Sequence, residues 1–173
     1  MGWVATVADL VTRARSPVIR DGYKFELDYA PEPEVPARLT RQLFALLQGL
    51  ILVRGGTVVT DEDRQRIARV AWDCLPALRA VVLQALVTPQ TLVDTSAIAV
   101  GVQYSTSTVR RTLEDLQALE LVTREKGTKA DRWAIREDWR APRAALFETL
   151  GLPTPPPEET SELPSYIPSA NPS

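Results

Sequence analysis

The chain has 173 residues, of which 45% are hydrophobic and 24% charged, so most of it can bury a core as one or two small domains. A formal net charge of −2 excludes a uniformly basic coat for binding nucleic acid, although a local basic face is still possible. The single cysteine, Cys74, excludes an intramolecular disulfide and is expected to be a buried small hydrophobe.

The first 35 residues are predicted to contain a helix, a β-hairpin and a linker. Apolar side chains recur at helical spacing over residues 3–15. The pair Asp21-Gly22 lies between β-prone residues and is a strong two-residue turn signal, so residues 17–27 are expected to form a hairpin. Prolines in residues 30–36 interrupt regular structure, and this run is expected to be a linker.

Residues 36–75 are predicted to form a helical domain. Pro36 suits the first position of a helix that runs to about Val53 and ends at a pair of glycines. Thr60 precedes three acidic residues, which is the pattern of a capping box and of a dipole-stabilised helix start. The apolar residues of this second helix are expected on one buried face, namely Ile67, Val70, Ala71 and Cys74.

Residues 76–150 are predicted to form a third unit, bounded by two further helices. Pro76 is expected to start a helix that reaches residue 87, and a last short helix is expected over residues 140–150. Residues 151–173 are rich in Pro, Ser and Glu, so we expect a disordered tail. The alternative for this tail is an extended ligand for an aromatic groove on a partner.

Residues 96–122 have the pattern of two helices joined by a tight turn. Ala99 is the small residue that would pack against the second helix, Gln103 occupies the turn, and Ser105 can cap the helix that follows. Gln tolerates the left-handed backbone of such a turn less well than Gly does. The apolar residues of the second helix are expected to face inward, namely Val109, Leu113, Leu116 and Leu119.

Residues 123–135 are predicted to form two strands around a basic tip at Gly127, with Trp133 and Ile135 directed to the core. Together with the preceding helices, this pattern resembles the winged helix-turn-helix of MarR, ArsR and GntR regulators. Short hydroxyls and cations at a helix start suit a major groove, and cations on the wing suit phosphates. The candidate DNA-binding residues are Ser105, Thr106, Ser107, Thr108, Arg110, Arg111, Arg124, Lys126, Lys129 and Arg132. The alternative is a winged helix that binds protein or only packs within an assembly, because acidic residues balance the cations.

Residues 36–63 are also similar, more loosely, to the helical lid that follows the nucleotide-binding core of AAA+ ATPases. The resemblance implies that Arg38 matches the arginine that such lids direct to a nucleotide phosphate. It also implies that the chain is a piece or partner of a larger ATPase assembly that acts on DNA. The chain contains no phosphate-binding loop of its own. A helical packing or dimerisation domain is the alternative.

Catalysis is not expected. The chain has no histidine, Cys74 has no basic partner in sequence, and helix-start chemistry explains the acidic run at residues 61–63. We therefore expect no metal and no cofactor. The sequence predicts a mainly α fold with a small β component, in a cytoplasmic protein with no membrane partner. The leading hypothesis is double-stranded DNA binding in transcriptional regulation, with a homodimer as one possible assembly. The alternatives are a module that docks on an ATPase in replication or mobile-element maintenance, and a scaffold with a recruiting tail.

Overall fold

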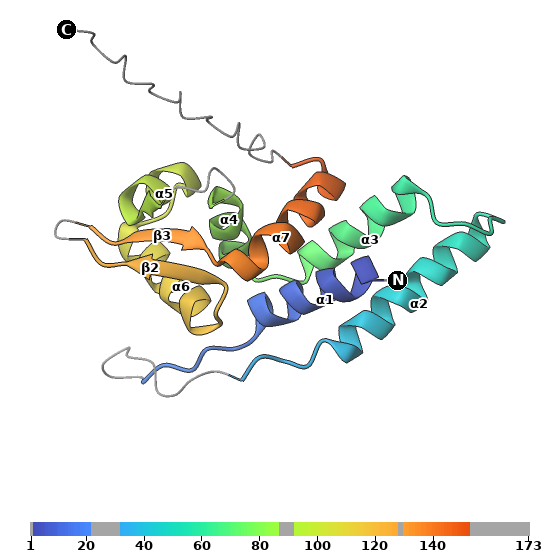
Figure 1. The fold of residues 1–173 in the computed structure, drawn as a ribbon, viewed down its shortest axis with the longest axis horizontal. Coiled ribbons are helices and arrows are strands. Elements are labelled where there is room, and N and C mark those ends of the chain that lie inside the picture. Colours follow the sequence, from blue (N-terminus) through green and yellow to red (C-terminus); the bar gives the residue numbers. More distant parts are fainter. Residues whose placement is uncertain (1, 22–31, 87–91, 128–129, 153–173) are drawn as a thin grey trace, which may run out of the picture.

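A computed structural model describes residues 2–21, 32–86, 92–127 and 130–152 of the chain. Within these ranges it contains seven helices and one three-stranded antiparallel sheet, which confirms the predicted mainly α fold with a small β component (Figure 1). The elements in chain order are α1 (Gly2–Arg15), α2 (Ala37–Val53), α3 (Asp61–Asp73), α4 (Ala77–Ala85), β1 (Val93–Asp94), α5 (Thr95–Val102), α6 (Thr106–Ala118), β2 (Val122–Glu125), β3 (Arg132–Ile135) and α7 (Glu137–Leu150).

The helices form two groups. Helices α1, α2 and α3 pack on one another, and α7 packs against both α1 and α3 (Figure 1). Helices α4, α5 and α6 form the second group, with the sheet beside α6. None of the helices in the described ranges combines the length and apolar character that a membrane crossing requires. Most of the predicted hairpin at residues 17–27 and nearly all of the Pro-rich tail lie outside the described residues.

Local signals account for the starts of α2 and α3. Pro36 precedes α2 as its N-cap residue rather than occupying the first helical position. Thr60 caps α3 as predicted: its hydroxyl accepts a hydrogen bond from the Asp63 backbone N–H, and the Asp63 carboxylate accepts one from the Thr60 N–H. This reciprocal pairing satisfies two of the backbone donors that a helix start leaves without partners.

The buried face of α3 differs from the predicted one. Ile67 and Ala71 are fully buried as expected, but Val70 is 43% exposed and Cys74 is exposed. The third fully buried residue in this stretch is Ala68. The stripe therefore follows i, i+1 and i+4 from Ile67, which leaves Val70 and Cys74 on its outer edge. The prediction that Cys74 is a buried hydrophobe is wrong, since Cys74 lies just beyond the last turn of α3.

Helix α7 begins at Glu137, three residues earlier than predicted, and contains Pro142 in its interior. Arg143 is buried on this helix, and its guanidinium donates a hydrogen bond to the Leu86 carbonyl oxygen at 2.8 Å. Burial lowers the pKa of Arg143 below its ordinary value. This contact satisfies a carbonyl just past the end of α4 and ties α7 to the second group of helices.

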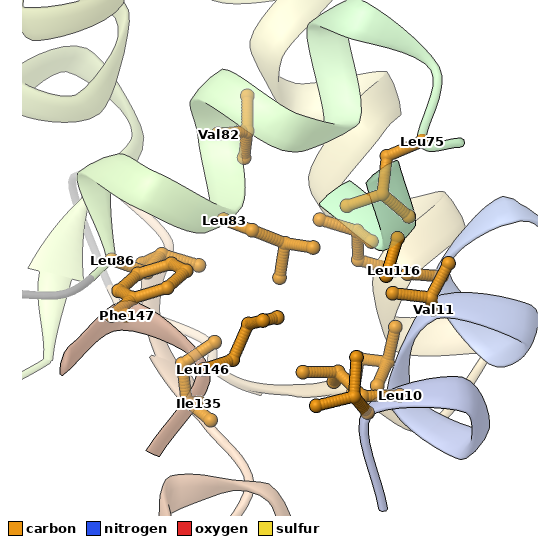
Figure 2. Close-up of a cluster of buried hydrophobic side chains, with 14 of the residues drawn as sticks. Leu10, Val11, Leu75, Val82, Leu83, Leu86, Leu116, Ile135, Leu146 and Phe147 are labelled. Carbon is orange, nitrogen blue, oxygen red and sulfur yellow. The ribbon is translucent and has the colours of Figure 1, made fainter. Parts of the chain in front are cut away.

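One continuous set of buried apolar side chains joins the two groups (Figure 2). Leu10 and Val11 of α1 lie near Leu116 of α6, and Leu83 of α4 lies near Leu146 of α7 (Figure 2). The core thus crosses residue 76, the predicted boundary between the helical domain of residues 36–75 and the unit of residues 76–150. That division itself stays a prediction.

The sheet has the strand order β1-β3-β2, with Val93 opposite Trp133 and Val122 opposite Ile135. The two-residue strand β1 was not predicted from the sequence. Trp133 and Ile135 are buried as predicted. The Trp133 indole N–H donates to the Thr95 hydroxyl at 2.8 Å, which fixes β3 against the start of α5.

Candidate nucleic-acid interface

The turn between α5 and α6 is formed by Gln103, which adopts a left-handed backbone with φ 59° and ψ 38°. The next N–H, that of Tyr104, donates to the Ala99 carbonyl oxygen at 3.2 Å and closes the end of α5. Gln therefore occupies the conformation that glycine adopts without strain. The turn predicted from the sequence is present in spite of its residue type.

Helix α6 starts with a cluster of hydroxyl groups. The Ser105 hydroxyl accepts a hydrogen bond from the Thr108 N–H at 3.2 Å, as predicted for a cap. Its oxygen also lies 3.0 Å from the Ser107 hydroxyl and 2.8 Å from the Thr108 hydroxyl. Ser105, Thr106 and Ser107 are exposed, whereas Thr108 is half-buried. The positive end of the helix dipole thus carries several donors that can reach an anion.

The amphipathic pattern of α6 directs its cations outward. The four apolar residues predicted to face inward, Val109, Leu113, Leu116 and Leu119, are all fully buried. Arg110 and Arg111, which lie between Val109 and Leu113 in the sequence, are exposed. The orientation of the helix that buries the leucines therefore leaves both arginines exposed, on the turn that follows the hydroxyl cluster.

The β2–β3 hairpin carries an exposed lysine and two arginines that are paired with acidic residues. Lys126 follows β2 and is exposed. Arg124 is 24% exposed, pairs with Asp131 at 2.6 Å, and its guanidinium carbon lies 5.4 Å from the centre of the Trp133 ring. Arg132 pairs with Glu125 on the neighbouring strand at 3.1 Å. The predicted contact Lys129 lies outside the described residues.

Asp131 links the hairpin and α6 electrostatically. The hydrogen bond from the Arg124 guanidinium lowers the pKa of Asp131 below its ordinary value, and the charges of Arg110 and Lys126 lower it further. The charges of three cations, from the hairpin and from α6, therefore favour the ionised form of this carboxylate. The negative charge of Asp131 offsets part of the local positive charge. Arg110, Arg111 and Lys126 are exposed and are the candidates for phosphate or base contacts.

Two residues of this surface were not among the predicted contacts. Tyr104 is 48% exposed directly before the Ser105 cap. Asp131 had been counted only as one of the balancing acids. The ion pair of Asp131 with Arg124 could not be predicted, because it depends on the strand register, which places Glu125 opposite Arg132.

Arg38, the candidate nucleotide sensor, lies apart from this surface in the first turn of α2. Its side chain is 73% exposed and pairs with Glu34 at 3.0 Å. Glu34 also accepts two hydrogen bonds from Arg15, at 2.6 and 3.0 Å. Arg38 thus belongs to a local ion-pair cluster that joins the end of α1 to the start of α2.

Comparisons with known proteins leave the family of the chain open. No protein-family model matches the sequence, and no curated protein matches it at a significant level. Among the described residues, no group of three or more Cys, Asp and Glu side chains is arranged to hold a metal ion.

Proposed function

We propose that residues 77–135 form a winged helix that binds double-stranded DNA, with α6 in the major groove and the β2–β3 hairpin against the backbone. The observation that carries the proposal is the shared exposure of Arg110, Arg111 and the Ser105–Ser107 hydroxyls on one end of α6. Donors at the start of an exposed helix, beside long cations, are the groups that read base edges and phosphates.

The order of elements supports the proposal. A helix, a short strand, two helices and two further strands, with the first strand paired to the last, arrange α6 and the hairpin side by side. The charge pattern supports a modest and local contact, because Arg124 and Arg132 are held by acids while Lys126 has an exposed side chain. A role in transcriptional regulation is part of the same proposal.

The test is fluorescence anisotropy of a labelled random duplex titrated with the full chain at two salt concentrations. We expect the double variant Arg110→Ala/Arg111→Ala to lose at least about tenfold in affinity, because each arginine contact contributes roughly 1–3 kcal/mol. The salt dependence should also weaken, since fewer counterions are released. Lys126→Ala should have a smaller effect, as expected for a single phosphate contact.

The matched control is Arg66→Ala/Arg69→Ala on the exposed surface of α3, which removes the same charge from another part of the molecule. If both double variants weaken binding equally, the attraction is a net-charge effect and α6 is not the reading surface. If neither changes the affinity, or the wild-type chain does not bind duplex DNA, the proposal fails.

A further inference from the structure

A cavity of about 330 Å³ lies among α1, α2 and the start of α3, remote in sequence from α6 and the hairpin. Its walls are mostly apolar and come from these helices and the segment that joins α2 to α3. The apolar lining residues are Trp3, Val4, Phe44, Leu47, Ile51 and Val59. Ligand pockets in proteins are typically of about 300–1,000 Å³ and have this apolar character, with a few polar groups that orient the ligand.

Three residues of the cavity carry polar groups, and none of the three is acidic. Arg64 lines the cavity, its side chain is exposed, and no ion pair between described residues involves it. The Trp3 indole N–H is buried and has no hydrogen-bond acceptor among the residues that the structure describes. Gln48 adds a neutral amide. Among the described residues, none with a carboxylate lines the cavity. Asp61 and Glu148 line a neighbouring hollow that shares Trp3 and Arg64 with it.

A cationic fork at an apolar cavity selects a particular chemistry. Arginine binds a carboxylate through two parallel hydrogen bonds, and the apolar walls remove a hydrocarbon or aromatic body from water. A cation would be repelled by the charge of Arg64. A strongly polar molecule would lose its hydration against the apolar side chains of Phe44, Leu47 and Ile51. We propose that this cavity binds a small apolar carboxylate, with its body among these three side chains and its carboxylate on Arg64.

The proposal is tested by isothermal titration calorimetry of the full chain with 2-naphthoate and with its neutral analogue 2-naphthalenemethanol. We expect 2-naphthoate to bind with one site per chain and Arg64→Gln to weaken it at least tenfold. The neutral analogue should bind more weakly than 2-naphthoate and equally to both proteins, because it has no charge for Arg64 to recognise. The matched control, Arg69→Gln, changes an exposed arginine of α3 that does not line the cavity and should bind 2-naphthoate as the wild type does.

A second variant locates the site by shape rather than by charge. Val59 lines the cavity and is 40% exposed, so Val59→Trp should fill the cavity without disturbing the buried core. It should abolish binding of both compounds while the far-UV circular dichroism spectrum is unchanged. Undiminished binding to Val59→Trp, equal affinity of Arg64→Gln and wild type, or the absence of any saturable heat with 2-naphthoate would each overturn the proposal. None of these outcomes depends on whether the chain binds DNA.

Discussion

Asp63 shows how a single buried charge can be held by its immediate neighbours. Its side chain is 2% exposed, and one carboxylate oxygen accepts hydrogen bonds from the Thr60 N–H at 2.9 Å, the Thr60 hydroxyl at 2.8 Å and Arg54 at 2.7 Å. The Thr60 N–H is the largest cause of the lowered pKa of Asp63, the Thr60 hydroxyl and Arg54 add to it, and burial opposes them. The capping box was predictable from sequence, whereas the clasp by Arg54 depends on the turn after α2.

We expect Asp63→Asn to lower the thermal unfolding midpoint at neutral pH, because the neutral amide loses the charge-assisted bonds to Arg54 and Thr60. The folded pKa of Asp63 is below the ordinary value of 3.8, so the stabilisation is full above 3.8 and is lost as the pH falls through the folded value. The difference between variant and wild type should therefore narrow in acid. Thermal melts from neutral pH to strong acid measure it, and Asp61→Asn, an exposed residue in the same turn, serves as the control.

At the scale of elements, the α5–α6 turn is the point where the residue type and the required backbone disagree. Gln103 and Glu120 are the two non-glycine residues with positive φ in the described ranges, and each follows the last turn of a helix. A left-handed backbone costs an ordinary residue about 1–2 kcal/mol. Burial of Ile98, Ala99 and Val109 on the two sides of the turn supplies the packing that maintains it.

We expect Gln103→Gly to stabilise the protein by about 0.5–1 kcal/mol, because glycine adopts this conformation without a steric penalty. The same substitution at Gln42, which is exposed within α2, should instead destabilise it by about 1 kcal/mol. Urea denaturation of the three proteins provides the comparison. Equal effects of the two variants would mean that the turn at Gln103 is not left-handed in solution.

At the scale of the whole molecule, polar contacts reinforce the apolar core between the two groups of helices. Arg79 of α4 donates to the Ala14 and Ser16 carbonyl oxygens at the end of α1, at 2.9 and 2.6 Å. Arg20 donates to Asp115 of α6 at 2.6 and 2.9 Å. Trp72 beyond the middle of α3 meets Phe147 of α7 edge to face, with ring centres 5.1 Å apart. Such continuity favours a single cooperative unit.

We therefore expect thermal unfolding to be one transition, with the same midpoint whether it is followed by far-UV circular dichroism or by tryptophan fluorescence. Trp72 reports on α3 and α7, and Trp133 reports on the sheet, so the fluorescence samples both groups. Two resolved transitions would instead indicate that the units on either side of residue 76 fold independently, as the sequence-based division suggests. The measurement thus decides between the shared core and the two-unit interpretation.

The features that the amino-acid sequence alone made predictable are those set by neighbours within one turn or one helix. The capping residues Thr60 and Ser105, the inward stripe of α6 and the ends of the β2–β3 hairpin depend on local hydrogen bonds and on helical or strand periodicity. These local rules also brought Arg110 and Arg111 to one exposed face. They failed at α3, where Ala68 rather than Val70 is buried and where Cys74 lies beyond the last turn of the helix.

Contacts between segments distant along the chain were decided only by the tertiary structure. The strand β1 is too short to have a pattern of its own and exists because Val93 pairs with Trp133 forty residues later. Burial of Arg143, the pairing of Arg124 with Asp131 and the apolar cavity beside Arg64 likewise depend on which elements pack together. Burial and pairing energies arise from surfaces that periodicity cannot align in space, so the charges available to a ligand become known only when the core is assembled.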